Sequence, residues 1–191
     1  MKSFLNIITL AILMALTISC SDNGSNSTGP DEIFGSISMT VTGAIDAVHE
    51  CDNRASCVVS FGEVITEIGS TTIYTWQIEA GDFTTFLPFG FSSTSFNSPV
   101  NRPAPGSYTL GSGMAPSFEA GYSNIEGGLN DDFSFETTDS VGGTLVIETS
   151  TNERVTGSFE FDAIHIDEGD NRTITVTGTF EAINEELLEG L

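Results

Sequence analysis

An acidic stretch near the C-terminus contains the residues best suited to hold a metal ion. Asp167, Glu168, Asp170 and Asn171 supply three carboxylates and an amide around Gly169. These oxygen donors are of the kind that Ca²⁺ takes, although the spacing lacks the closing glutamate of an EF-hand loop. A solvated acidic turn between two strands is the simpler interpretation of the same residues. Calcium at this loop is therefore the one cofactor that the sequence suggests.

Two cysteines of the folded region are close enough in sequence to form a disulfide. Cys51 and Cys57 are separated by five residues, Asp52 to Ser56. In an exported protein such an even pair predicts a disulfide, which would stabilise the fold by about 2 kcal/mol by closing a small loop. The alternative is a metal or thiol site that also uses His49. Only one histidine is nearby and no Cys-x-x-Cys spacing exists, so the disulfide is favoured.

The residue types used in nucleophilic and acid–base catalysis are scarce in this chain. The two histidines are His49, beside the cysteine pair, and His165, at the end of a predicted strand. A break in the alternation after Ala163 suggests a bulge next to His165. Neither a Gly-x-Ser-x-Gly elbow nor a His-Glu-x-x-His motif is present. With 27 acidic residues, neighbouring carboxylates carry no specific signal. We therefore predict no catalytic residue and no enzyme activity.

The N-terminus resembles a bacterial lipoprotein signal. Lys2 provides the positive charge, Phe4–Leu16 is an apolar segment, and Thr17-Ile18-Ser19 precedes Cys20, with Thr17 where leucine is usual. The apolar segment is too short to span a bilayer as a helix. We predict that residues 1–19 are removed and that Cys20 is lipidated. Residues 20–32, which are polar and rich in Ser, Asn and Gly, would then form a flexible tether.

The charge of the mature chain excludes several classes of partner. Residues 20–191 contain 27 acidic residues and four arginines, so the net charge is 4 − 27 = −23. Such a field repels nucleic acid phosphates and anionic lipid surfaces, which argues against a role in nucleic acid binding. It favours cations or cationic partners, although an acidic surface that keeps the protein soluble explains the same composition.

The residues that follow the tether alternate between apolar and polar side chains, as in half-buried β-strands. About ten strands are expected, separated by turns rich in Gly, Asn and Asp: 36–42, 58–66, 73–80, 83–93, 107–110, 117–122, 133–137, 144–149, 155–161 and 173–181. Hairpins are expected at Ile68–Thr71 and Ser150–Arg154, and Asn97–Gly106, with three prolines, should connect strands without joining a sheet. The pattern predicts an all-β fold for residues 33–183, an antiparallel β-sandwich of immunoglobulin-like or jelly-roll-like type, with a closed lipocalin-like β-barrel as the alternative. Residues 184–191 would form a C-terminal tail, with Asn184 as an N-cap.

Four segments combine strand and turn patterns in a recognisable order. They are Pro105–Gly111, Gly143–Ile147, Arg154–Phe161 and Thr175–Phe180. Together they resemble a family of uncharacterised lipoproteins found widely in Bacteroidetes and related bacteria. The resemblance covers roughly residues 83–182, and it does not include the loop between Cys51 and Cys57. It implies a β-sandwich lipoprotein of the cell envelope, and it implies no catalytic residues because the family has no established activity.

The sequence thus predicts a membrane-anchored protein of the bacterial cell envelope that acts as a structural or binding module. The outer membrane is the expected location, because Ser21 rather than an aspartate follows the lipidated cysteine. A glycan or a protein of the envelope is the expected partner. An envelope enzyme without a recognisable site and a carrier with an internal cavity are the alternatives.

Overall fold

A computed structural model gives the fold of residues 34–52, 57–82, 87–123, 134–167 and 169–188. Cys20, the predicted tether and Glu168 lie outside the described residues, so the lipidation of Cys20 stays a prediction. Asn130, Asp131 and Asp132 form a further acidic cluster in the sequence, with fewer oxygen donors than the loop at Asp167, and they also lie outside the described residues. No helix in the described part of the chain is both long and apolar enough to cross a membrane.

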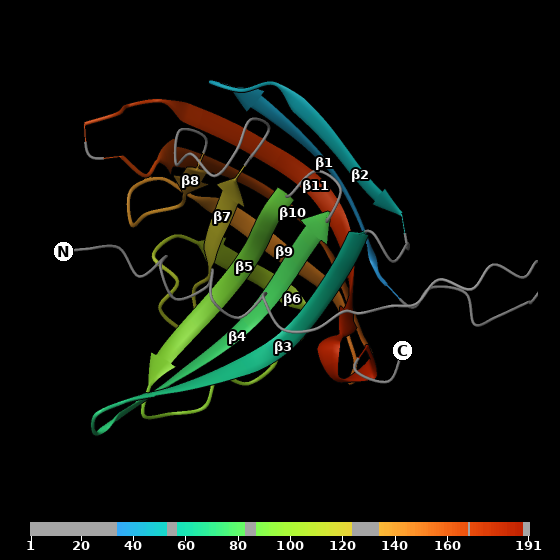
Figure 1. Ribbon diagram of the computed structural model, residues 1–191, viewed down its shortest axis with the longest axis vertical. Helices are drawn as coiled ribbons and strands as arrows, with labels where there is room; N and C mark the ends of the chain where they lie inside the picture. Colours follow the sequence, from blue (N-terminus) through green and yellow to red (C-terminus); the bar gives the residue numbers. More distant parts are fainter. Residues whose placement is uncertain (1–33, 53–56, 83–86, 124–133, 168, 189–191) are drawn as a thin grey trace, which may run out of the picture. The chain divides into compact units, whose positions relative to one another are not determined.

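Eleven strands and one short 3₁₀ helix make up the regular structure of the described residues (Figure 1). They are β1 (Ser36–Gly43), β2 (Ala47–Asp52), β3 (Cys57–Ile68), β4 (Thr71–Asp82), β5 (Leu87–Phe96), β6 (Gly106–Leu110), β7 (Glu119–Ser123), β8 (Ser134–Glu136), β9 (Gly143–Ser150), β10 (Arg154–His165), β11 (Thr173–Asn184) and η4 (Glu185–Leu187). The all-β expectation is confirmed, as are both hairpins and the strand-free segment before β6. The sequence analysis missed β2.

The strands form one mixed sheet that is folded into two layers. One layer has the order β2-β1-β11-β10-β9-β6 and the other the order β3-β4-β5-β7-β8. Figure 1 shows β3, β4 and β5 crossing in front of the strands of the first layer. Strand pairing joins the two layers at two corners of the described sheet, where two residue pairs link β11 to β3 and two link β10 to β8. Backbone hydrogen bonds of Phe118 with Thr109 and Gly111 add a further link at the end of β6. Such short junctions fit a sandwich rather than the continuous ladder of a closed barrel.

Antiparallel pairing was predicted, and the β11–β3 junction is the one parallel pairing among the named strands of the described residues. β11 has β10 along one edge, and along its other edge β1 gives way to β3 beyond Glu181. The ladder of β1 stops there because Gly35 turns the chain at φ +73°. The carbonyl of Phe34 then accepts a hydrogen bond from the Val59 N–H at 2.8 Å.

The space between the layers is filled by the inward side chains of the alternating strands. Phe89 and Phe91 of β5 meet Phe159 of β10, with ring centroids 5.0 and 5.2 Å apart. Phe180 of β11 lies 6.0 Å from Phe91. All of these rings are buried, and each contributes about 1.5–3 kcal/mol by leaving water. The phenylalanine-rich segments are therefore the centre of the core.

A disulfide joins Cys51 of β2 to Cys57 of β3, which confirms the predicted pairing. The two Cα atoms are 5.6 Å apart, and both side chains are buried. Because β2 belongs to one layer and β3 to the other, this bond adds a covalent link between the layers. With both thiols engaged, a metal or thiol site made of His49, Cys51 and Cys57 is excluded.

The bulge suggested next to His165 is wrong. Ala163 and His165 both point inward and Ile164 lies between them on the outer face, so the alternation continues to the end of β10. The irregularity of β10 lies instead between Thr156 and Gly157, where the register with β9 shifts. An inward-pointing histidine resembles a break in the pattern because polar residues normally face solvent.

Candidate functional site

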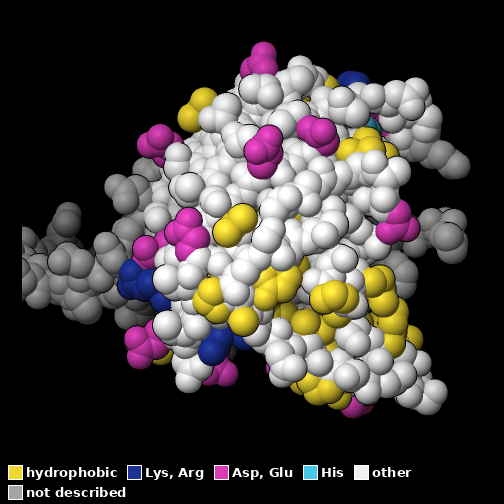
Figure 2. All heavy atoms as spheres, turned by 180° about the vertical axis from the view of Figure 1, so that it is seen from behind, with side chains coloured by type: hydrophobic (Ala, Val, Ile, Leu, Met, Phe, Trp, Pro, Cys, Tyr) yellow, Lys and Arg dark blue, Asp and Glu magenta, His cyan; other side chains and the backbone are white. Residues whose placement is uncertain are grey.

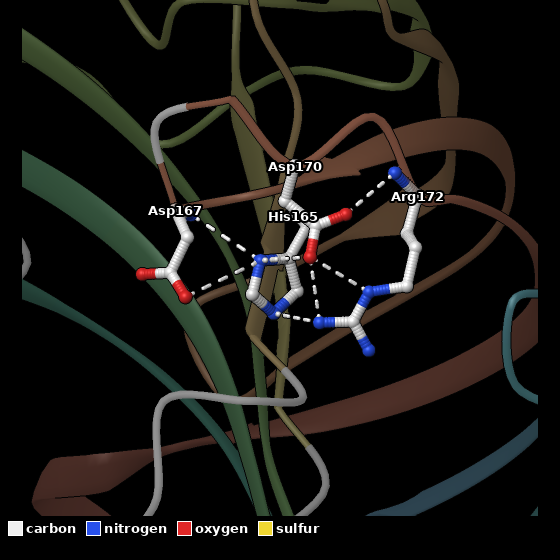
Figure 3. A network of polar contacts seen from close by, with 4 residues as sticks. All are labelled: His165, Asp167, Asp170 and Arg172. Carbon is white, nitrogen blue, oxygen red and sulfur yellow. Dashed lines mark hydrogen bonds and ion pairs between the residues drawn. The ribbon is translucent and has the colours of Figure 1, made fainter.

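His165 is the centre of a polar network that closes the turn between β10 and β11 (Figure 3). It is the last residue of β10, its side chain is fully buried, and its ring packs edge-on against Phe135 at 5.2 Å. The turn brings Asp167, Asp170 and Arg172 around the two ring nitrogens. The sequence placed the acidic residues in one loop, but it gave no sign that they surround a histidine.

The partners of the ring define the tautomer of neutral His165. The Arg172 Nη2 lies 3.1 Å from Nε2, and a guanidinium only donates, so Nε2 accepts. The proton of the neutral ring then belongs on Nδ1, which faces Asp170 Oδ2 at 3.4 Å and Asp167 Oδ2 at 3.8 Å. The Asp167 N–H, 3.3 Å from Nδ1, is the weaker competitor for that position.

Asp170 is engaged on both of its carboxylate oxygens by Arg172. Oδ1 accepts from the Arg172 backbone N–H at 2.9 Å, and Oδ2 accepts from Nε at 2.8 Å and lies 2.7 Å from Nη2. The side-chain hydrogen bond from Arg172, followed by the backbone one, holds the pKa of Asp170 below its ordinary value. The carboxylate therefore stays charged and acts as the anchor of the turn.

The predicted calcium loop coincides with this network. Asp167 is exposed, Asp170 is held by Arg172, Asn171 is exposed, and Glu168 lies outside the described residues. A cation at Asp170 would have to compete with the guanidinium for the same oxygens. Among the described residues, no group of three or more His, Cys, Asp or Glu side chains is arranged to hold a metal ion. Calcium binding stays a prediction.

His49 lies on the inner side of β2 and reaches across to the other layer. Its Nε2 is 3.0 Å from the hydroxyl of Tyr122 on β7, and the two rings are 5.9 Å apart. Tyr122 is buried among the aromatic side chains of the core. The contact satisfies the hydroxyl of a buried tyrosine, as such side chains require. Both histidines of the chain thus take part in internal contacts between strands or turns.

Two carboxylates that the sequence analysis did not single out come together on the outer face of β7 and β8. Glu136 pairs with Gly121, which places it diagonally across from Glu119. Burial, and to a lesser extent the charge of Glu136, raises the pKa of Glu119 to about 7. Burial also raises the pKa of Glu136, whose Oε1 has no hydrogen-bond partner among the described residues. A carboxyl that titrates near neutral pH can donate or accept a proton.

A third carboxyl with a raised pKa lies on the same outer face. Glu79 of β4 is shielded from solvent, and Glu185 adds a like charge that raises the pKa further. Glu185 belongs to η4, which lies against β3 because Gly62 has no side chain at that point. The outer face of the second layer therefore carries carboxyls on β4, β7 and β8. No sequence spacing could reveal them, because strand register alone brings them to one face.

Comparison of the chain with protein-family models, with curated proteins and with solved structures found no match.

Proposed function

We propose that this chain is a lipid-anchored protein of the bacterial cell envelope whose β domain serves as a binding or structural module. The observation that carries the proposal is that only three residues, the last of them Ser19, separate Cys20 from an apolar segment of signal-peptide length. The disulfide between Cys51 and Cys57 supports an oxidising compartment outside the cytoplasm. The resemblance to Bacteroidetes lipoproteins supports the outer membrane as the location and is itself part of the proposal.

The contacts of the histidines support a module over an enzyme. His165 is enclosed by the turn that it stabilises, and His49 contacts a buried tyrosine. Neither ring is presented as a general base toward solvent. The acidic surface supports a neutral or cationic ligand, such as an uncharged glycan or a basic protein segment, and argues against nucleic acid.

Metabolic labelling with an alkyne-tagged fatty acid tests the lipid anchor. The full chain, expressed in a bacterium that processes lipoproteins, should incorporate the label and sediment with membranes. The Cys20→Ser variant should lose the label and appear in the soluble extracytoplasmic fraction. Its Cys51–Cys57 disulfide, measured by thiol alkylation, should remain intact and serves as the folding control. Equal labelling of both proteins, or none in either, would contradict the proposal.

Thermal melts test the binding module and the calcium loop together. A ligand that binds only the folded state at a hundredfold excess over its Kd raises stability by about 2.7 kcal/mol, which appears as several degrees in Tm. Uncharged envelope glycans, calcium and EDTA are compared on the mature chain. A rise with calcium that Asp170→Ala abolishes would assign the loop to the metal. An unchanged Tm with calcium would contradict calcium binding at this loop and would mean that Asp170 serves only in its ion pair with Arg172.

An envelope enzyme is the second candidate function, and the Glu119–Glu136 pair is the observation that favours it. Two adjacent carboxyls with raised pKa values are the groups that acid–base hydrolysis of a glycan would use. Hydrolysis of envelope glycans that both Glu119→Gln and Glu136→Gln abolish would support this candidate. Hydrolysis that both variants retain would assign it to a contaminant.

A further inference from the structure

The β3–β4 hairpin exposes an apolar surface near its turn, on the outer face of the second layer. This surface, which we call the hairpin patch, consists of Val64, Ile68, Ile73, Phe96 and Met114. Four of these side chains are 39% (Val64), 52% (Ile68), 46% (Phe96) and 46% (Met114) exposed. Ile73 pairs with Phe96, and Met114 forms an isolated bridge with Thr94 of β5, so the five residues lie on three neighbouring strands and the segment beside β5 and face the same side.

The hairpin patch contains no charged side chain, although the chain is strongly acidic. Four threonines, Thr66, Thr71, Thr75 and Thr94, lie between these side chains on the same face, and the carboxyls of Glu79, Glu119 and Glu136 lie beyond them on that face. The two glutamates of this part of β3, Glu63 and Glu67, point to the opposite face because side chains alternate along a strand. The opposite face thus carries these two glutamates together with the exposed Ile65, and at the end of the hairpin only the outer face is free of charge.

The size and surroundings of the hairpin patch argue against a second protein molecule as its main occupant. Four neighbouring segments spaced about 4.8 Å apart and three rows about 7 Å apart give an area of about 400 Å². A stable protein interface buries about 800 Å² on each partner, which is well above this area. A second copy of the chain would also bring the same excess of acidic residues, so the two would repel each other.

We propose that the hairpin patch lies on the surface of the membrane that anchors the chain, in contact with zwitterionic phospholipid. Such a surface needs neither shape complementarity nor opposite charge, and it accepts exposed Phe, Ile and Met side chains in its interfacial region. The proposal deepens the proposed function and rests on the anchor at Cys20.

The length of chain between Cys20 and the described domain allows this contact. Phe34 is hydrogen-bonded to Val59, and the hairpin ends nine residues further along β3, about 30 Å away. Cys20 precedes Phe34 by 14 positions, which span about 46–50 Å when extended. The number of residues between Cys20 and Phe34 is therefore sufficient for a lipid at Cys20 to insert into a membrane that the hairpin patch contacts.

Photolabelling from the lipid phase tests the proposal. Residues 20–191 are coupled through the Cys20 thiol to a maleimide lipid in phosphatidylcholine vesicles that contain a diazirine-bearing acyl chain. Cys20 can be coupled selectively because the other two cysteines form the disulfide. After illumination, label should concentrate in peptides from the hairpin and the end of β5. It should fall several-fold in the double variant Ile68→Ser, Phe96→Ser, and also in Met114→Gln.

The matched control is Val48→Ser, which removes an apolar side chain that is 69% exposed on β2, in the other layer. Its labelling pattern should not change, and all variants should keep the disulfide. Even labelling over the domain, or labelling that the double variant leaves unchanged, would overturn the proposal. A dimer of residues 20–191 in detergent-free solution, measured by light scattering and lost in the double variant, would assign the hairpin patch to self-association and overturn the proposal as well. Because the lipid is attached chemically, the result does not depend on whether cells acylate Cys20.

Discussion

At the residue scale, two glycines make room for the aromatic core. Gly178 of β11 pairs with Phe159 of β10, and Gly157 pairs with Phe180. A Cβ atom at Gly178 would lie 2.6 Å from Phe159 Cζ, and one at Gly157 would lie 2.9 Å from Phe180 Cε1. Each ring thus occupies the space above the glycine on the neighbouring strand. The close approach of the two rings to the backbone requires a residue without a side chain at both positions.

Alanine at Gly178 should therefore destabilise the fold. The added methyl group pushes against Phe159 and the backbone of β1, and such overpacking typically costs about 1–3 kcal/mol. Urea unfolding measures the free energy of unfolding of Gly178→Ala and of Gly121→Ala. Gly121 has open space where a Cβ would be, so its variant should stay within about 0.5 kcal/mol of the parent. Equal stability of the two variants would refute the packing argument.

The Glu119 carboxyl makes stability depend on pH near neutrality. Its pKa rises from 4.5 in the ordinary state to about 7 in the fold. Between pH 4.5 and 7 the folded state binds more protons than the unfolded state. The contribution of Glu119 to the free energy of unfolding is therefore fully present below pH 4.5 and is lost as the pH rises through 7. Partial solvent exposure of the side chain weakens the effect, which we put at about 1–2 kcal/mol.

Glu119→Gln should remove this part of the pH dependence. The amide keeps the size of the side chain and carries no charge. The free energy of unfolding of the variant should therefore increase relative to that of the parent protein as the pH rises from 5 to 8. Urea midpoints at half-unit pH steps measure the difference. Glu153→Gln is the control, because Glu153 is exposed in the turn between β9 and β10. A difference between parent and Glu119→Gln that does not change with pH would contradict the raised pKa of Glu119.

At the scale of elements, the period of two predicted nearly all of the strands and both hairpins. It failed at β2, where His49 points inward between Ala47 and Cys51 and hides the alternation. It also could not place the carboxyls of Glu119 and Glu136. They are 17 positions apart, and only the register of β7 with β8 makes them neighbours. Contacts that depend on register or on an inward polar side chain are set by tertiary packing, which local patterning does not contain.

The disulfide belongs to this scale because it links two strands of different layers. Replacing Cys51 and Cys57 together by alanine should lower the free energy of unfolding by about 2 kcal/mol, as expected for a small closed loop. The buried positions of both residues allow alanine without exposing a polar group. Urea unfolding of the double variant and of the parent chain with a reducing agent, both carrying Cys20→Ser, measures the effect. A much smaller loss would mean that the ladder to β1 and the contact of His49 with Tyr122 hold β2 in place without the disulfide.

At the scale of the whole molecule, charge is the dominant property. The chain carries a net charge of −22, and acidic side chains are distributed around the face seen in Figure 2, whereas hydrophobic side chains gather in its lower part. The chain has 27 acidic and only five basic residues, and among the described residues the ion pairs of Arg154 with Glu181 and of Arg172 with Asp170 engage two of the four arginines. Repulsion between the remaining charges therefore opposes the folded state.

Salt should accordingly stabilise this protein. At 0.02 M ionic strength the repulsion acts over about 20 Å, and at 0.5 M it is screened within about 4 Å, so most of the unpaired carboxylates no longer interact. We expect the free energy of unfolding to rise by about 1 kcal/mol between these conditions. Urea unfolding in sodium chloride measures the change, and a constant m value shows that the unfolded state is not the cause. Sucrose at equal osmolality is the control, because it is excluded from the protein surface but does not screen charges. A rise with sodium chloride that exceeds the rise with sucrose is due to screening. A fall in the free energy of unfolding with added salt would contradict this expectation. It would mean that the attraction within the ion pairs at Arg154 and Arg172 contributes more to stability than the repulsion between carboxylates costs.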